Sequence, residues 1–585
     1  MLTVLRGRPE GSPARTNPRI ARCLRSFLLA VGIVVVAVGV GQMLHGATLT
    51  GYSVDESTHV ERLRNWHDHG WYLRDRELDS DDLPLELLAD RSVYGPAFAL
   101  LAHSANVTLG NETYGEVATT AAANDVRHLT VAFLGGLTVV AVGLIAWLMS
   151  GSLLAAVWAS AALSSVPVWV GHAMFNIKDV PTAAGYTLAS LSLAMATVSA
   201  STERDGWAQA ALAATVMAAG VAVGVGTRTG SWILIFVSII AYYVVRRLQM
   251  GRTDRWLLSP SDIGILGGGL VGLAAVLTLY PNNAARPLTW FVDAVRVSAD
   301  YPWVGPTLTA GRLLDENPAW WYLPIWVGAS VPVIVTAVAV TGLGATAYVL
   351  VRMFHQSVDG RLRSVASDPR ITIVFVLLQL LLGPLAAIVF GSALYTGLRQ
   401  QLFIVPPIAV LAGLGVATLI AWLGNQRRWG ALLGAAGLGI GLLLPTTDQI
   451  RLHPYQYVYL NEFASPINGR WETDYWFVGA REAIRRIPAD ARAQCSGWLL
   501  HPWHPDRDPY RFSDCRGSIG PYLSEQGAEA IDADLADDEA WVIGRARAGN
   551  RPPDGCREVE NVTRPLHDEQ VVITYLLACP REPAA

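Results

Sequence analysis

The chain has 585 residues, of which 52% are hydrophobic and only 16% charged, and its formal net charge is -4. Its mean hydropathy of +0.33 lies above that of ordinary soluble domains and predicts a polytopic membrane protein. Arginines gather in a few short loops, and acidic residues gather in one long loop and in the C-terminal tail. This distribution gives nucleic-acid binding little support.

The first 25 residues contain six arginines and one acidic residue, Glu10. Positive charge next to a first apolar span is typical of the cytoplasmic side, so residues 1–25 are predicted to form a cytoplasmic leader. Residues 27–44 are long enough to cross a hydrocarbon core of roughly 30 Å. The alternative, a cleavable signal peptide, lacks a convincing small-residue cleavage site. We therefore expect this first span to remain as an anchor.

Ten further apolar segments follow, so that eleven transmembrane helices are expected in all. An odd number of spans places the two termini on opposite sides of the membrane. The ten segments are 129–149, 153–170, 182–200, 207–225, 231–245, 263–280, 323–351, 371–390, 402–423 and 431–444.

The long polar stretch between the first two spans, residues 46–127, is rich in acidic side chains. Amphipathic pieces at 60–71 and 83–88 predict short helices along the membrane interface. A turn at Tyr94 is expected to lead into another such helix. With an N-terminus inside the cell, this acidic stretch is an outer loop.

The charges of the other loops support this orientation. Counting from a cytoplasmic N-terminus, the inner loops are the arginine-rich segments 246–255, 352–370 and 427–428. The outer loops then include 176–181, 226–230, 281–322 and 391–401. We expect a transmembrane module at 26–446 and an extracytoplasmic domain at 447–585.

Cysteines favour the same orientation, because four of the five lie in the C-terminal tail and only Cys23 lies elsewhere. An even number in a polar domain predicts two disulfides in an oxidising compartment, although reduced thiols are the alternative. Four cysteines allow three pairings; proximity in sequence favours Cys495 with Cys515 and Cys556 with Cys579. A helix near 479–486 and alternating strands at 540–545 and 570–577 predict a small α/β domain.

Lys178 is the only lysine among the 44 basic residues of the chain. An ammonium group is a compact point charge with three rotatable donors and is not interchangeable with a guanidinium. Lys178 therefore marks a candidate phosphate-binding position. The alternative is that this lysine occurs by chance in an arginine-favouring sequence and has no special function. Its neighbours Asn176 and Asp179 lie in the same outer turn, which Pro181 is expected to close.

Asp55 and Glu56 follow the first span by about ten residues and suit a general base or a metal or hydroxyl ligand at the interface. The competing explanation is a capping box from Ser53 to Glu56, in which the acids only satisfy helix amides. Arg228, between glycines, and Arg399 are outer arginines that either bind a phosphate or extend to lipid headgroups.

These motifs resemble the GT-C superfamily of membrane glycosyltransferases, in particular bacterial relatives of protein O-mannosyltransferases and of the lipid A aminoarabinose transferase. One departure is Ile177, where proline is common in the similar Asn-Pro-Lys-Asp-Val-Pro pattern. The segments that carry the resemblance are 54–56 (Val-Asp-Glu), 175–181 (Phe-Asn-Ile-Lys-Asp-Val-Pro), 320–324 (Trp-Trp-Tyr-Leu-Pro), 394–403, 453–461 and 472–476.

The resemblance implies an inverting transfer of a sugar from a polyprenyl-phosphate donor to a protein, lipid or glycan acceptor on the outer face. It implies Asp55 as catalytic base, Glu56 and Asp179 in support, and Lys178 on the donor phosphate. Metal dependence varies in the superfamily, so no metal is assigned and a divalent ion remains open. The further candidates are Arg228 and Arg399 for donor phosphate, and Asn176, His59 and Tyr94 for substrate.

Two other classes of protein compete with an enzyme as interpretations of the sequence. A transporter or lipid flippase also places charges near membrane boundaries, but it is expected to bind at the midplane and often shows internal repeats. Here the candidate charges are predicted on one face, and no half-chain repeat is evident. A structural scaffold for cell-wall assembly would leave Asp55 and Lys178 without a role.

Overall fold

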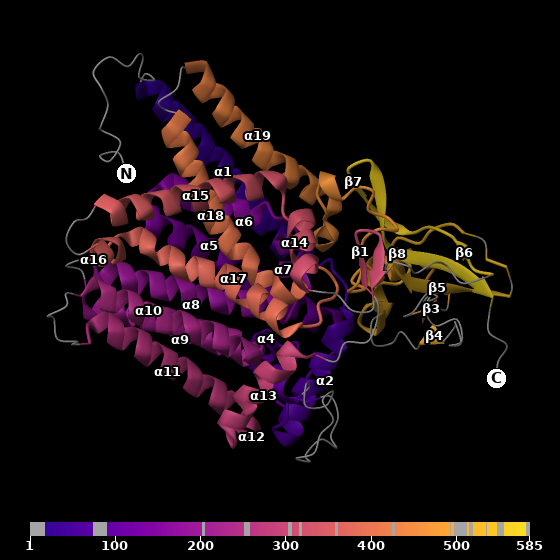
Figure 1. Ribbon diagram of the computed structural model, residues 1–585. Helices are drawn as coiled ribbons and strands as arrows, with labels where there is room; N and C mark the ends of the chain where they lie inside the picture. The colour runs from indigo at the N-terminus through magenta and orange to yellow at the C-terminus, as the bar shows by residue number, and fades with distance from the viewer. Residues whose placement is uncertain are drawn as a thin grey trace.

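The computed structural model combines a bundle of long helices with a small sheet domain beyond one end of the bundle (Figure 1). Helices from the first four fifths of the chain form the bundle, and the last part of the chain forms the sheet domain. The described residues are 18–73, 91–201, 205–250, 258–301, 307–314, 319–356, 361–423, 428–491, 493–496, 512–513, 519–533, 535–536, 538–546 and 555–580.

Within these residues, ten helices are long and apolar enough to cross a membrane, or eleven when the bent pair α6–α7 counts as one span. The predicted polytopic helical fold is therefore confirmed. The candidate spans comprise α1 (Pro18–Ala47), α5 (Ala121–Ser150), α6 (Leu153–Ser164) with α7 (Pro167–Phe175), α8 (Asp179–Ala200), α9 (Trp207–Thr227), η1 (Thr229–Ser231) with α10 (Trp232–Gln249), α11 (Pro260–Leu279), α15 (Val333–Gln356), η2 (Pro369–Thr372) with α17 (Ile373–Phe390), η3 (Arg399–Ile404) with α18 (Val405–Leu423), and α19 (Arg428–Leu452).

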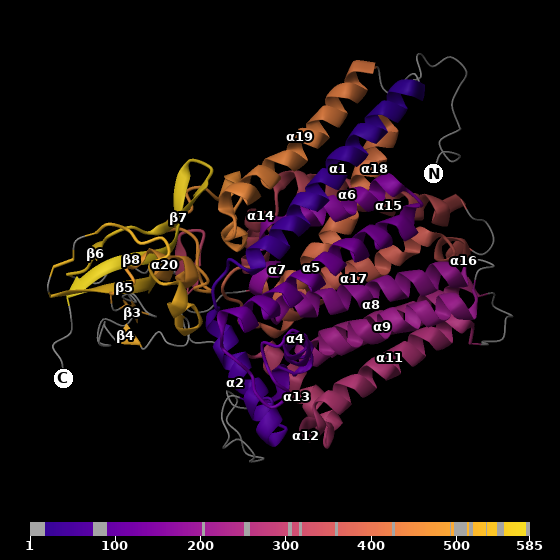
Figure 2. The same ribbon diagram turned by 180° about the vertical axis from the view of Figure 1, so that it is seen from behind.

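The two ends of the bundle carry different structures. Figures 1 and 2 show the start of α1 and α16 (Arg361–Ala366) at one end and the sheet domain beyond the other, with α2 (Val54–His69) beside it. Eleven crossings, the count when α6–α7 is one span, require this separation of the start of α1 from the sheet domain.

The third predicted span is not one straight helix. The single helix expected at 153–170 is divided into α6 and α7, whose axes differ by 67°. Pro167 has no backbone N–H and disfavours helical geometry at the residue before it. Val166 accordingly has an extended backbone, with φ -85° and ψ 104°. The bend turns α7 toward the end of the bundle that carries the sheet domain.

The eighth predicted span, 323–351, is also divided, into α14 (Ala319–Ser330) and α15. Pro332 follows the end of α14 and accounts for the break, for the same steric reason as at Pro167. A segment of 29 residues is longer than one crossing needs. The division leaves α15 alone as the candidate span and α14 against the sheet-domain end.

The acidic stretch after the first span contains two well-defined helices, α2 and α4 (Ala97–Thr108). Helix α2 is longer than the predicted 60–71, and Asp55 and Glu56 lie in its first turn. Helix α4 follows Tyr94 as expected, whereas the predicted helix at 83–88 lies outside the described residues. Two short helices, α12 (Pro281–Ala284) and α13 (Pro287–Ala299), and a hairpin of β1 (Thr307–Thr309) and β2 (Arg312–Leu314) follow α11.

The C-terminal domain is α/β, as its alternating pattern predicts. Its strands form one sheet in the order β4-β3-β5-β8-β6, with β7 also paired to β8, and only β3 and β5 are parallel. The elements are η4 (Gln456–Val458), η5 (Glu462–Ala464), α20 (Ala480–Arg486), β3 (Ala493–Ser496), β4 (Phe512–Ser513), η6 (Gly520–Glu525), β5 (Glu539–Arg545), β6 (Arg557–Glu558), β7 (Val562–Leu566) and β8 (Glu569–Pro580).

One of the two expected disulfides is present in this domain. Cys556 and Cys579 are bonded, which confirms that predicted pair. Cys515 of the other predicted pair lies outside the described residues, as does the side chain of Cys495. Cys23, at the start of the first span, is free and exposed.

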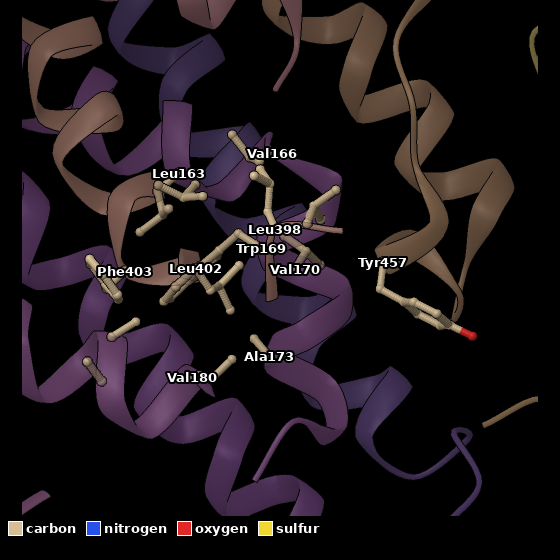
Figure 3. Close-up of a cluster of buried hydrophobic side chains, with 14 of the residues drawn as sticks. Leu163, Val166, Trp169, Val170, Ala173, Val180, Leu398, Leu402, Phe403 and Tyr457 are labelled. Carbon is tan, nitrogen blue, oxygen red and sulfur yellow. The ribbon is translucent and has the colours of Figure 1, made fainter. Parts of the chain in front are cut away.

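A buried apolar cluster joins the bent pair α6–α7 to the segment that begins α18. It anchors the chain on both sides of Arg399, because Leu398 and Leu402 are 2% and 1% exposed. Figure 3 shows that these two side chains gather with residues of α7 and with Val180, which follows Lys178 by two positions. The backbones that carry the two basic residues are therefore held by the same core.

Candidate functional site

Asp55 lies at the centre of a charged cluster at the sheet-domain end of the bundle. Its Oδ2 accepts hydrogen bonds from Lys178 Nζ at 2.5 Å and from Arg399 Nη1 at 3.1 Å. The side chain of Asp55 is 31% exposed, whereas those of Lys178 and Arg399 are 8% and 9% exposed. The arrangement is one accessible carboxylate resting on two buried cations.

The cations control the charge of Asp55. Burial alone would raise the pKa of the Asp55 carboxyl, but Lys178 and Arg399 outweigh burial and hold that pKa well below its usual range. For Lys178, burial alone would lower the pKa of the ammonium, and the neighbouring Asp55 and Tyr94 raise it above its usual value. Both groups are therefore charged at neutral pH, as a buried pair requires.

The turn before α8 positions Lys178. Asn176 Oδ1 accepts hydrogen bonds from the backbone N–H groups of Lys178 and Asp179, at 3.3 and 3.0 Å, as in the local turns that asparagine favours. Asn176 Nδ2 also donates to Asp179 Oδ2 at 3.0 Å. The sequence suggests that Pro181 closes this turn. In the structure Pro181 lies instead in the first turn of α8. Proline is accepted there because the first amides of a helix have no helical partner.

Asp179 is paired with a second basic residue from another loop. Arg228 Nη1 donates to Asp179 Oδ1 at 2.8 Å. The backbone of Arg228 forms an isolated antiparallel bridge with Tyr94, and Gly95 N donates to Thr227 O at 3.1 Å. A Cβ at Gly95 would lie 2.4 Å from the carbonyl oxygen of Gly226, so only glycine permits this approach. The loop after α9 is thus joined to the turn before α4.

Glu56 lies apart from the cluster. Its carboxylate accepts from Ser53 N at 2.6 Å, which completes the capping box, and its other oxygen lies 2.9 Å from His128 Nε2. The residue is fully buried. The structure therefore separates the two adjacent carboxylates: Asp55 faces the cations, and Glu56 holds the start of α2 against α5.

His59 and Tyr94, predicted to contact substrate, lie near Lys178. The two rings meet edge to face with centroids 5.2 Å apart, and Lys178 Nζ lies 5.5 Å from the centroid of Tyr94. Burial lowers the pKa of His59 well below its usual value, and the cations Arg62 and Lys178 lower it further. Although burial would raise the pKa of Tyr94, the surrounding cations lower it. A neutral imidazole and a polarised phenol thus line the site.

Aromatic residues from later in the chain complete the cluster, and the sequence did not single them out. Trp476 of the C-terminal domain lies under both cations, and Tyr395 lies under Arg399 with 4.8 Å from Cζ to the ring centroid. Trp476 belongs to a segment that carried the family resemblance. No pattern within that segment indicates that it reaches residues near 178 and 399.

A hydrogen-bonded chain continues from Asp179 into the C-terminal domain. Asn176 Nδ2 lies 3.1 Å from His172 Nδ1, and His172 Nε2 lies 3.1 Å from the Tyr475 hydroxyl. His172 is completely buried. Tyr475 precedes Trp476 in the chain. The hydrogen-bonded chain therefore fixes the position of the segment that carries Trp476 relative to the turn that carries Lys178.

Asp474 shapes the segment that carries these aromatic residues. It is fully buried, and its Oδ1 accepts from the Phe477 backbone N–H at 2.7 Å and from the Tyr457 hydroxyl at 2.5 Å. The turn also gives Phe477 a left-handed backbone, with φ 65°. Burial raises the pKa of Asp474 to about 6, although these donors and the Arg545 cation oppose the rise.

This raised pKa predicts a pH-dependent stability. The folded protein holds the Asp474 proton more tightly than the unfolded chain, so the contribution of this group to stability is fully present below its ordinary pKa of 3.8 and is lost as the pH rises through about 6. A shift of about two pH units corresponds to about 3 kcal/mol. We expect Asp474→Asn to flatten the dependence of the apparent thermal midpoint between pH 4.5 and 7.5, measured on the full chain. An unchanged pH dependence would contradict the assignment, and exposed Asp538→Asn is the control.

The residues of the cluster suit an anionic ligand. Three basic side chains, Lys178, Arg228 and Arg399, meet there, and each is paired with a carboxylate. In the part of the chain that the structure describes, no three His, Cys, Asp or Glu side chains are arranged to hold a metal ion. The fold and the site together define a polytopic helical membrane protein with a cluster of paired carboxylates and cations at one end of its bundle.

Comparison with solved structures returns two crystal structures of one protein. The chain is similar to two crystal structures of ArnT from Cupriavidus metallidurans. The structure in the apo state shares 13% sequence identity with a TM-score of 0.44, and the structure bound to undecaprenyl phosphate shares 14% with a TM-score of 0.45. Each alignment covers 93% of this chain and 97% of that chain. No protein-family profile and no curated protein matches the chain.

Proposed function

We propose that the protein is an integral membrane glycosyltransferase of the GT-C type. It moves a sugar from a polyprenyl-phosphate donor to an acceptor at the outer face of the bacterial inner membrane. The observation that carries this proposal is the accessible Asp55 carboxylate paired with two buried cations, Lys178 and Arg399, where the helices end. The arginine-rich loops of the sequence belong to the opposite side and support an outer location for the site.

The cations form the donor half of the site. Lys178 and Arg399 bind the donor phosphate, and Arg228 extends the same positive surface. Phosphate oxygens accept charge-assisted hydrogen bonds from such groups, which are about twice as strong as neutral ones. Asp179 and Asn176 act as positioning residues, since Asp179 pairs with Arg228 and Asn176 fixes the turn of Lys178. Binding at a bundle end suits a donor whose phosphate lies at the membrane surface.

Asp55 is the catalytic base in this proposal. It takes the proton of an acceptor hydroxyl while that oxygen bonds to the anomeric carbon of the sugar. The bond from that carbon to the phosphate oxygen breaks, and polyprenyl phosphate leaves with the electron pair, so the anomeric configuration inverts. When the donor phosphate engages Lys178 and Arg399, it shares the cations that hold the pKa of Asp55 low. The carboxylate thereby becomes more basic when the donor is present.

The remaining candidates have supporting roles. Glu56 is a positioning residue that fixes the first turn of α2 through Ser53 and His128. His59 and Tyr94 line the acceptor side, next to Lys178. The acceptor is a hydroxyl-bearing protein, lipid or glycan.

A transporter of a lipid-linked substrate is the second candidate, and its chemistry distinguishes it. Transporters bind near the middle of the bilayer, whereas these charges lie at loops and helix ends beside the sheet domain. Transport would leave the donor intact, but transfer breaks the bond between sugar and phosphate.

The decisive experiment follows both halves of a labelled donor. Purified protein is incubated with a panel of polyprenyl-phosphate sugars and with membranes as the source of acceptor. We expect free polyprenyl phosphate to appear together with labelled acceptor. Movement of intact donor across vesicles, without release of polyprenyl phosphate from any member of the panel, would replace the enzyme with a transporter.

A further inference from the structure

Trp476 lies under both cations of the donor half, although it belongs to the C-terminal domain. The centroid of its ring is 4.6 Å from Arg399 Cζ and 5.5 Å from Lys178 Nζ. Trp476 is only 1% exposed. The face of an indole attracts cations more strongly than any other side-chain ring, and the attraction grows when water is excluded. The indole therefore helps to hold two like charges close together.

Two donors at this contact have no acceptor. Among the described residues, neither Trp476 Nε1 nor Arg399 Nε has a hydrogen-bond partner, and both atoms are buried. An unsatisfied buried N–H costs free energy, and such groups in native proteins require an explanation. Both belong to side chains that contact each other at the cation cluster. The simplest explanation is that an acceptor atom of a ligand satisfies them.

Two backbone hydrogen bonds hold Trp476 in this position. The backbone N–H of Trp476 donates to Asp474 Oδ1 at 3.2 Å, and its carbonyl accepts from Val54 N at 3.1 Å. Val54 immediately precedes Asp55. The same short segment therefore meets the base on one side and the cations on the other, so the C-terminal domain contributes directly to the site.

We propose that Trp476 is a ligand-binding residue of the donor half. Its ring supports Lys178 and Arg399, and its indole N–H and Arg399 Nε–H donate to a phosphate oxygen of the lipid-linked donor. This inference rests on the proposed function, because it takes the ligand to be a polyprenyl phosphate. It adds that the membrane helices without the C-terminal domain form an incomplete site.

The test is the binding of a polyprenyl phosphate, without any turnover, to the full-length protein in detergent. Trp476→Phe retains an aromatic ring and removes the N–H. We expect its dissociation constant to rise roughly tenfold or more, because hydrogen bonds to charged groups have that effect. Trp541→Phe, which changes a buried tryptophan of β5 outside the site, is the matched control and should bind as the wild type does. A Trp476→Phe protein with wild-type affinity would overturn the proposal.

A second variant tests the contact from the other side and does not depend on Trp476→Phe folding well. Arg399→Lys retains the positive charge but loses Nε and the planar group that lies over the indole. We expect it to weaken binding of the same lipid. In the double variant the two losses should be less than additive, since both residues serve one ligand group. Full additivity would contradict a shared phosphate oxygen.

Two further binding measurements distinguish the remaining outcomes: inorganic phosphate with Trp476→Phe, and polyprenyl phosphate with the wild-type protein. A loss of affinity in Trp476→Phe for inorganic phosphate alone would show a site for free phosphate and would overturn the assignment to the lipid donor. Failure of the wild type to bind any polyprenyl phosphate would overturn the proposed donor class as well. Wild-type binding with an unaffected Trp476→Phe overturns only the role of Trp476.

Discussion

Asp55→Asn is expected to lower the rate of sugar transfer by about 10²- to 10⁴-fold, the usual contribution of a positioned acid or base. The same variant should bind polyprenyl phosphate at least as tightly as the wild type. Asparagine removes the charge that neutralises Lys178 and Arg399, which then face the ligand with their full positive charge. Single-turnover rates with labelled donor and equilibrium binding of polyprenyl phosphate, measured separately, test the two statements.

Glu56→Gln is the matched control, because it makes the same chemical change at the adjacent position. Glu56 caps α2 and contacts His128, so its replacement should lower stability by about 1 kcal/mol while retaining transfer activity. If Glu56→Gln abolished transfer in a folded protein and Asp55→Asn did not, the two carboxylates would have exchanged roles. Weaker lipid binding by Asp55→Asn would contradict the competition between carboxylate and phosphate for the cations.

Hydropathy and local sequence predict most of the fold. The apolar segments mark the spans, and the alternating pattern marks β5 and β8. The missed features are the breaks at Pro167 and Pro332, where length and composition favour a continuous span. The prolines themselves were visible in the sequence. Whether a proline breaks a membrane helix into two or only kinks it depends on neighbouring segments that can satisfy the freed backbone groups.

The candidate site is predictable only in part. Residues 55, 178, 228 and 399 stand out because charged groups next to apolar spans are candidates for function, and the structure brings all four side chains to one end of the bundle. The division of labour between Asp55 and Glu56 depends on which face of α2 meets His128. The position of Trp476 depends on the docking of a separate domain. Neither is a property of local sequence.

The structure joins the two halves of the site through the C-terminal domain. Val54 N donates to the Trp476 carbonyl, and Asn176 connects through His172 to Tyr475. Adjacent residues of one segment therefore contact both the residue next to Asp55 and the turn that carries Lys178. A displacement of that segment would change the distance between Asp55 and Lys178. This coupling gives a physical reason for the C-terminal domain at the end of the proposed enzyme.

Replacement of Lys178 is expected to have the opposite effect on binding from replacement of Asp55. Lys178→Ala should weaken binding of polyprenyl phosphate about 30-fold or more, since truncating one member of a buried charged pair costs about 2–5 kcal/mol.

Lys178→Arg should bind no better than Lys178→Ala, although it keeps the charge. The lysine is 8% exposed and its Nζ lies 5.5 Å from the ring centroids of both Tyr94 and Trp476, so we expect the larger planar guanidinium to be overpacked at this position. Equilibrium binding and transfer rates are measured for both variants. Arg370→Lys, in η2 at the other end of the bundle, controls for the exchange of the two residue types. Wild-type binding and turnover in Lys178→Arg would mean that positive charge alone is required at this position and that the single lysine of the chain has no special function.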